Sequence, residues 1–188
     1  MLLNRVFVTG AYGVGKSTLC KLIAQKSKFS HLKASELIYS YLKQTPPRNK
    51  QVSDVQYNQK ILIQAFAMQK ELHPNCLLEG HMCLLDKNNE IQKIPFNVFK
   101  ELELTAIVIV TRNVVSVRKG LLERDQIVYD QKRLEKIQCL ELVRAKEFSQ
   151  KEKIPFLQID LDKMTLYEAS ESSLKFLRHA CQTPIISV

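Results

Sequence analysis

The chain has 188 residues, of which 45% are hydrophobic and 25% charged, and its formal net charge is +9. This length predicts one domain with a full core and excludes a large appended module. No run approaches the roughly 18 apolar residues of a membrane span, and no signal peptide pattern opens the chain. We therefore expect a cytoplasmic protein, or a nuclear one if its source is eukaryotic, without membrane contact. The positive charge favours anionic partners and leaves RNA or ribosomal contact open.

The five cysteines are odd in number and form no Cys-x-x-Cys pair. Most of them lie in apolar surroundings, as is typical of reduced intracellular thiols. Their spacing indicates no metal site. The cysteines are Cys20, Cys76, Cys83, Cys139 and Cys181.

A phosphate-binding loop begins at residue 10, between an apolar strand at 2–9 and a helix at 17–26. Its glycines let backbone N–H groups wrap phosphates, and the helix N-terminus adds partial positive charge. Lys16 is expected to reach the β- and γ-phosphates, and the Ser17 hydroxyl to bind Mg²⁺. The segment predicts binding of a nucleoside triphosphate through Gly10, Tyr12, Gly13, Val14, Gly15, Lys16, Ser17 and Thr18.

Strands and helices alternate along the rest of the chain, which predicts an α/β fold. We expect five parallel strands covered by helices on both faces. Further strands are predicted at 29–34, 76–79, 105–110 and 156–159. Further helices are predicted at 35–42, 54–72, 96–102, 114–123, 131–152 and 165–180. Ser35 is expected to cap the helix at 35–42, and Ile61, Ala65, Met68 and Leu72 to form the apolar stripe of the helix at 54–72.

A second motif, Glu79-Gly-His81, follows the short apolar run 76–78. Ligands of parallel α/β sheets gather at the carboxyl ends of strands, where the phosphate-binding loop also emerges. A carboxylate there accepts a hydrogen bond from metal-bound water, so Glu79 is the predicted magnesium-site acid. His81 lies close to the same site in the sequence.

At this point the chain resembles the adenylate kinase-like P-loop kinases, and among them the short-lid group of archaeal-type and eukaryotic nuclear adenylate kinases. The resemblance runs to about residue 160 and rests on segments 8–18, 78–83, 107–112, 122–124 and 132–139. It implies a P-loop NTPase fold with a short lid, ATP as substrate, and Mg²⁺. It also implies roles for His81 in catalysis and Arg112 in nucleotide binding. Two departures are Glu79, where the family usually carries Asp, and Tyr39, where an arginine is typical.

The acceptor is expected to bind a helical insertion at 31–72, because segment 31–37 resembles the opening of the family's monophosphate site. Glu36 lies in that segment, and Arg48 and Lys50 are nearby cations that would hold an acceptor phosphate. The presence of Tyr39 in place of the arginine typical of the family argues against AMP itself as the acceptor.

The predicted lid covers residues 118–130. Phosphoryl transfer needs alignment and cationic stabilisation of the moving group, and a lid supplies late cations and excludes water. Arg124 in the lid and Arg144 in the following helix are the candidates for that contact.

The sequence thus predicts transfer of the γ-phosphoryl group of ATP to a nucleoside monophosphate. Two alternatives stay open. One is a kinase of a nucleoside, a polynucleotide end or another small molecule. The other is a nucleotide-dependent ATPase or switch that binds RNA or a ribosomal protein. No guanine-specifying Asn-Lys-x-Asp motif is found, which favours ATP as donor.

Overall fold

The computed structural model describes residues 3–44, 51–52 and 54–180. Its main sheet has five strands in the order β2-β4-β1-β7-β8, and every pairing is parallel. This confirms the predicted α/β fold. The strands are β1 (Asn4–Thr9), β2 (Ser30–Lys33), β4 (Asn75–Glu79), β7 (Ala106–Thr111) and β8 (Phe156–Asp160).

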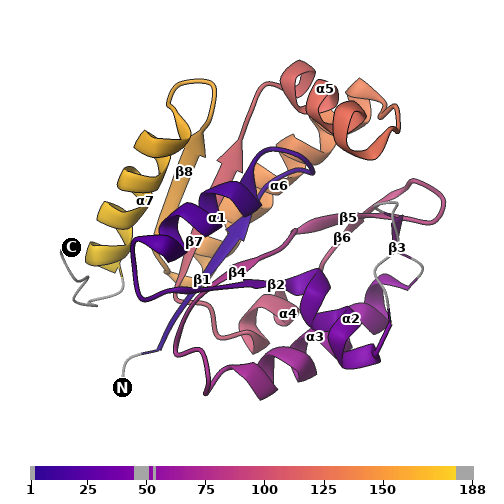
Figure 1. Cartoon of the computed structure of the whole chain (residues 1–188). Helices are drawn as coiled ribbons and strands as arrows, with labels where there is room; N and C mark the ends of the chain where they lie inside the picture. Colours follow the sequence, from indigo (N-terminus) through magenta and orange to yellow (C-terminus); the bar gives the residue numbers. More distant parts are fainter. Residues whose placement is uncertain (1–2, 45–50, 53, 181–188) are drawn as a thin grey trace.

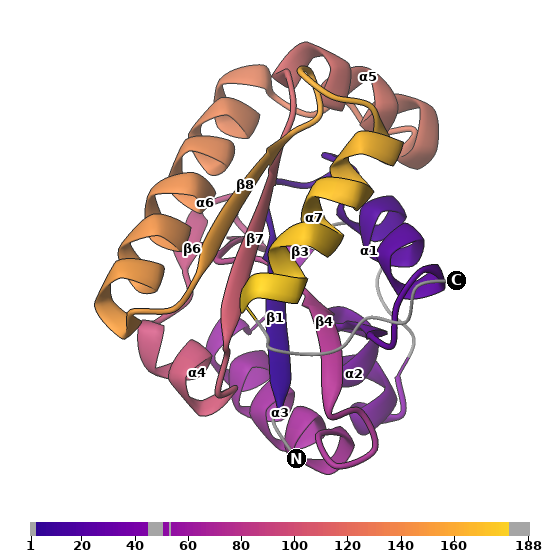
Figure 2. The ribbon, with the colours of Figure 1, turned by 90° about the vertical axis from the view of Figure 1, so that its left-hand side faces the viewer.

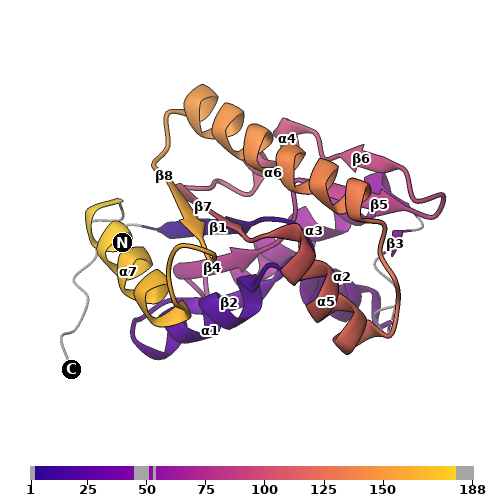
Figure 3. The ribbon, with the colours of Figure 1, turned by 90° about the horizontal axis from the view of Figure 1, so that it is seen from above.

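Helices cover both faces of this sheet, with α1 and α7 on one face and α4 and α6 on the other (Figure 3). Among the described residues, no helix combines the length and apolar character needed to cross a membrane. The helices are α1 (Lys16–Gln25), α2 (Ala34–Leu42), α3 (Val55–Gln69), α4 (Phe96–Glu101), α5 (Val114–Asp125), α6 (Gln131–Glu152) and α7 (Leu166–Ala180).

The central strands are buried on both faces, which explains their continuous apolar sequences. In β1, Val6 and Val8 enter the core beneath α1 and α7, whereas Phe7 enters the core on the other face. Strand β7 repeats this alternation through Val108 and Ile109. Figure 2 shows β1 at the middle of the sheet, between β4 and β7. The phosphate-binding loop therefore follows the central strand of the sheet, in which every residue is buried.

A second, smaller sheet was not predicted. It contains β3 (Gln51–Val52), β5 (Cys83–Asp86) and β6 (Ile91–Lys93) in the order β3-β5-β6. Strands β5 and β6 pair antiparallel, and the Asp86 carboxylate accepts the backbone N–H groups of Asn88 and Glu90 in the turn between them. Figure 1 shows this sheet on the same side of the molecule as α2 and α3.

Two local predictions were wrong. Helix α2 begins at Ala34 after Lys33, so Ser35 lies inside the first turn and does not cap it. The buried face of α3 carries Ile61 and Ala65 as expected, but Met68 and Leu72 are 69% and 72% exposed. That face is centred on Leu62, Ala65 and Phe66, which places Met68 beyond its edge, and Leu72 follows the end of the helix.

Candidate active site

The phosphate-binding loop joins β1 to α1 and uses glycine where other residues would be strained. Gly10 and Gly15 have φ values of +141° and +107°, which L-residues rarely adopt. A Cβ atom on Gly10 would lie 2.3 Å from the carbonyl oxygen of Val110. The loop therefore lies tightly over the end of β7.

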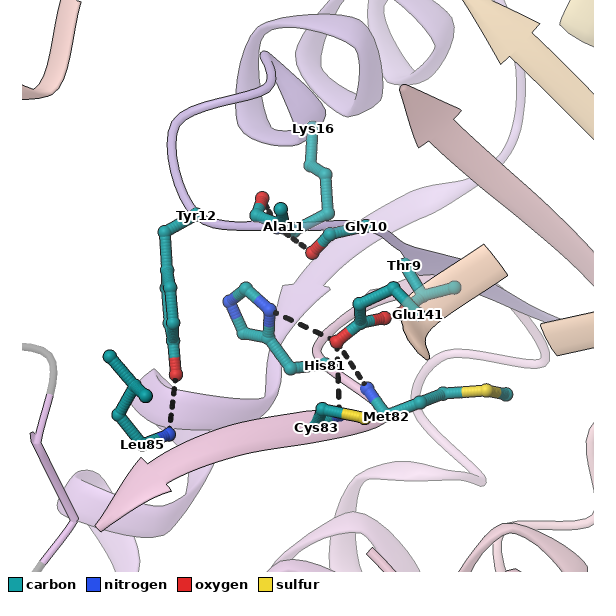
Figure 4. Close-up of polar contacts among 10 residues, drawn as sticks. All are labelled: Thr9, Gly10, Ala11, Tyr12, Lys16, His81, Met82, Cys83, Leu85 and Glu141. Atoms are coloured by element: carbon teal, nitrogen blue, oxygen red, sulfur yellow. Dashed lines mark hydrogen bonds and ion pairs between the residues drawn. The ribbon is translucent and has the colours of Figure 1, made fainter. Parts of the chain in front are cut away.

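Lys16 is the first residue of α1, and it is 5% exposed. Its ammonium group donates hydrogen bonds to the carbonyl oxygens of Gly10 and Ala11, at 2.8 and 2.9 Å (Figure 4). The charge is thus held within the loop predicted to bind the donor phosphates.

Ser17 and Glu79, the two predicted magnesium ligands, lie in hydrogen-bond contact. The Ser17 hydroxyl donates to Glu79 Oε1 at 2.6 Å, and His31 Nε2 lies 2.8 Å from Glu79 Oε2. Burial alone would raise the pKa of Glu79, but the hydrogen bonds from His31 and Ser17, with the charge of Lys16, lower it to about 2. Glu79 is therefore a carboxylate at neutral pH. His31, as the partner of this acid, was not predicted.

His81 lies between the loop and the end of β4. Its ring centroid is 4.4 Å from that of Tyr12, and its Nδ1 atom is 3.6 Å from Oε1 of Glu141 (Figure 4). Burial, with the charge of Lys16, lowers the pKa of His81, although Glu141 opposes this. His81 is therefore neutral at pH 7, with its ring packed against Tyr12 of the phosphate-binding loop.

Glu141 is a site residue that the sequence analysis missed. It is fully buried on α6, and its Oε1 atom accepts the backbone N–H groups of Met82 and Cys83 at 2.8 and 2.9 Å. The Thr9 hydroxyl donates to the other oxygen. A sequence signal existed, because Glu141 falls in the buried stripe of α6. The other members of that stripe are Leu134, Ile137, Ala145 and Phe148.

A pocket opens beside the Glu79-Gly-His81 segment, with a cavity volume of about 130 Å³. Most of its lining surface comes from apolar side chains of the sheet and of α2, α3 and α4. Glu79 and His81 line this pocket and also contact the phosphate-binding loop. The described lining residues are Phe7, Lys33, Ala34, Ser35, Ile38, Tyr39, Asn58, Gln59, Leu62, Glu79, Gly80, His81, Leu84, Ile94 and Phe99.

The predicted phosphate-contacting arginines have other partners in this structure. Arg124 is exposed and forms two hydrogen bonds with the neighbouring Asp125, at 2.6 and 2.7 Å. The Arg144 guanidinium lies 4.4 Å from the centre of the Phe96 ring and donates to the carbonyl oxygen of Ile94. Arg112 is exposed at the end of β7. Their roles in phosphate binding stay predictions.

The predicted acceptor residues are only partly described. Glu36 is exposed on α2 and forms an ion pair with Lys33 at 2.5 Å. Arg48 and Lys50 lie outside the described residues.

Comparison with known families adds one decisive match. A family model described as an AAA domain matches residues 9–138, which is more than half of the chain. The chain belongs to this AAA domain family. The match begins at the last residue of β1 and includes the phosphate-binding loop, α5 and every described pocket-lining residue except Phe7. The comparison does not confirm the narrower adenylate kinase subgroup. No curated protein matches the sequence.

Solved structures similar to this AAA domain share its fold at low sequence identity. A shikimate kinase from Acinetobacter baumannii in complex with shikimate has a TM-score of 0.63 and 14% identity, and 94% of each chain is covered. A sugar kinase from Janibacter sp. HTCC2649 has a TM-score of 0.59 and 13% identity, covering 96% of this chain and 97% of that one. A gluconokinase from Sinorhizobium meliloti 1021 has a TM-score of 0.57 and 11% identity, with 96% and 95% coverage. The fold is therefore that of the P-loop kinases.

Proposed function

We propose that this protein is an ATP- and Mg²⁺-dependent phosphotransferase whose acceptor is a nucleoside monophosphate. The proposal depends mainly on one observation, the boundary shared by the phosphate-binding loop and the pocket. Glu79 and His81 line the pocket, while Glu79 binds Ser17 and His81 packs on Tyr12. An acceptor in the pocket would lie beside the donor phosphates, as direct transfer requires.

On the donor side, the residues present fit magnesium. The Ser17 hydroxyl and the Glu79 carboxylate are hard oxygen ligands, 2.6 Å apart, and Glu79 is ionised. They would hold Mg²⁺ directly or through water. When bound, the ion would neutralise charge on the β- and γ-phosphate oxygens. Lys16 would exchange its two carbonyl partners for phosphate oxygens.

On the acceptor side, the pocket combines an apolar wall with two side-chain amides. Ile38 and Leu62 suit the faces of a nucleobase, and Asn58 and Gln59 suit its hydrogen-bonding edge. Gln59 is 5% exposed, and its Oε1 atom has no hydrogen-bond partner in the described structure. We propose that a base N–H donates to this oxygen. Arg48 and Lys50 remain our candidates for binding the acceptor phosphate.

In the reaction, a phosphate oxygen of the acceptor forms a bond to the γ-phosphorus of ATP, and the bond to the β–γ bridging oxygen breaks. ADP leaves with that electron pair. The acceptor phosphate is already anionic, so no general base is needed. Neutral His81, between the loop and the pocket, would orient the incoming oxygen, and the lid with Arg124 would close over the site.

A second candidate acceptor is a small molecule with a hydroxyl group. Lys33 is the one lysine or arginine among the described pocket-lining residues, and it is paired with Glu36. Such a lining suits an uncharged polar group as well as a base. The similar structures include sugar, gluconate and shikimate kinases, whose acceptors carry hydroxyl groups.

An acceptor panel distinguishes these functions. The protein would be incubated with γ-labelled ATP and Mg²⁺ alone, or with nucleoside monophosphates, nucleosides, sugars, shikimate or short oligonucleotides. We expect label in a nucleoside diphosphate that depends on added monophosphate. The panel includes Lys16→Ala as an inactive variant and Lys146→Ala, at an exposed position of α6, as its matched control. Label found only as inorganic phosphate, unchanged by any acceptor and stimulated by RNA, would instead support the ATPase or switch.

A further inference from the structure

Three side chains with different metal-binding atoms meet behind the phosphate-binding loop. They are Cys20 on α1, His31 on β2 and Glu79 at the end of β4. The sulfur, a ring nitrogen and a carboxylate oxygen all lie within 4.8 Å of one another. His31 Nε2 and Glu79 Oε2 are already 2.8 Å apart. Small side-chain rotations would bring the three atoms to the separations found around one ion.

The fold places these residues together. Strands β2 and β4 are paired so that His31 aligns with Leu77 and Lys33 with Glu79. His31 and Glu79 are therefore neighbours on the face of the sheet that α1 covers, because Leu77 on that face lies in the same core cluster as Leu19 and Cys20. Cys20 lies one helical turn after Lys16 and is fully buried.

The chemistry of the cluster differs from that of a magnesium site. Mg²⁺ prefers oxygen ligands and retains water, whereas thiolate and imidazole favour Zn²⁺ and similar transition metals. One thiolate, one imidazole and one carboxylate are common zinc ligands. Neither Cys20 nor His31 is a ligand in the magnesium site proposed above, where His31 contacts only the carboxylate of Glu79. The sequence spacing indicated no cysteine metal site, since these ligands come from three separate elements.

We propose that Cys20, His31 and Glu79 form a Zn²⁺ site that competes with the catalytic magnesium for Glu79. Zinc binding would release the thiol proton of Cys20 to solvent, and the ring proton of His31 would reside on Nδ1. Glu79 would turn from Ser17 toward the zinc ion, with water as the fourth ligand. The proposed inhibition of turnover by zinc rests on the proposed kinase function, but zinc binding itself does not.

Cobalt(II) tests the site without any measurement of activity. Bound to the purified protein, Co²⁺ should give a thiolate-to-metal charge-transfer band that added Zn²⁺ removes. The band should persist in the control Cys139→Ser/Cys181→Ser, because Cys139 is exposed on α6 and belongs to no such cluster among the described residues. It should be absent in Cys20→Ser. A band that Cys20→Ser retains, or its absence from the parent, would overturn the proposal.

A second variant covers the case in which Cys20→Ser folds poorly. His31→Gln should weaken zinc binding at least about tenfold. Mutation of even an outer-shell partner of a metal ligand typically lowers metal affinity about 10- to 100-fold. Zinc should also raise the melting temperature of the parent and of the double cysteine control, but not that of His31→Gln. Equal zinc affinity in parent and His31→Gln would exclude this site.

Measurements of turnover test separately whether zinc competes with magnesium for Glu79. With a phosphoryl acceptor from the panel, buffered free Zn²⁺ should inhibit the parent, with relief by chelator or excess Mg²⁺. Cys20→Ser should keep its activity and lose this sensitivity. If zinc binds as described but does not inhibit the parent, the proposed competition with magnesium does not occur. If no acceptor is phosphorylated, the proposed kinase function fails while the cobalt result still decides the zinc site.

Discussion

The Ser17 hydroxyl donates a 2.6 Å hydrogen bond to Glu79, a residue 62 positions later in the chain. This contact joins the first turn of α1 to the carboxyl end of β4. It is possible because β1 and β4 are adjacent parallel strands, with Val8 aligned to Glu79. Both ligands of the proposed magnesium ion are therefore fixed by the centre of the sheet.

Replacing Glu79 with Gln should raise the Mg²⁺ concentration needed for half-maximal turnover and lower the maximal rate by about 10²-fold or more, because one anionic ligand is lost. Glu71→Gln, at an exposed position, is the matched control. Turnover measured across a magnesium titration checks this. Parent-like magnesium dependence in Glu79→Gln would remove Glu79 from the metal site.

The same carboxylate should make stability depend on acid pH. Its pKa is about 2 in the folded protein, against an ordinary value of 4.5, so the folded state favours the charged form. The resulting stabilisation is complete above pH 4.5 and is lost as pH falls toward 2. This difference corresponds to about 3 kcal/mol. Unfolding free energies of parent and Glu79→Gln should therefore converge within this range, and a constant difference would contradict the assigned pKa.

Glu141 should matter mainly for stability. Glu141→Leu would leave the backbone N–H groups of Met82 and Cys83 and the Thr9 hydroxyl without their acceptor in the core. We expect the free energy of unfolding to fall by about 3 kcal/mol or more in urea titrations. Glu147→Leu, at an exposed position of the same helix, should change it far less. Equal stabilities of the two variants would show that this network contributes little.

Gln59 should contribute to binding of the acceptor and not to binding of ATP. Gln59→Leu removes the buried amide oxygen at similar volume, so the acceptor KM should rise about tenfold, as expected for one lost hydrogen bond. The KM for ATP should stay within about twofold, because Gln59 lines only the pocket. Gln56→Leu, which is exposed on α3, serves as control. A changed KM for ATP with an unchanged acceptor KM would reverse the assignment of the pocket.

Much of the fold could be predicted, because the long apolar strands and periodic helices are local signals. Helix α6 was predicted at its observed bounds, and the sites of Lys16, Ser17 and Glu79 follow from parallel-sheet topology. The hairpin of β5 and β6 was missed because its short strands lack a strong alternating pattern. Glu141 and His31 were missed because their partners come from other elements. The predicted roles of Arg124 and Arg144 in phosphate binding depend on the position of the lid, which the local sequence does not determine.

If the donor and acceptor sites share one boundary, a single molecule that spans both sites should bind this protein tightly. A mimic of this kind, adenosine joined through five phosphates to the nucleoside of the acceptor that the panel identifies, should bind at one molecule per protein. It should bind much more tightly than ATP, because linkage makes occupation of the second site intramolecular. In calorimetry, Lys16→Ala should weaken the mimic and ATP, whereas Gln59→Leu should weaken only the mimic. If the mimic binds no more tightly than ATP and is insensitive to Gln59→Leu, the donor and acceptor sites are not adjacent.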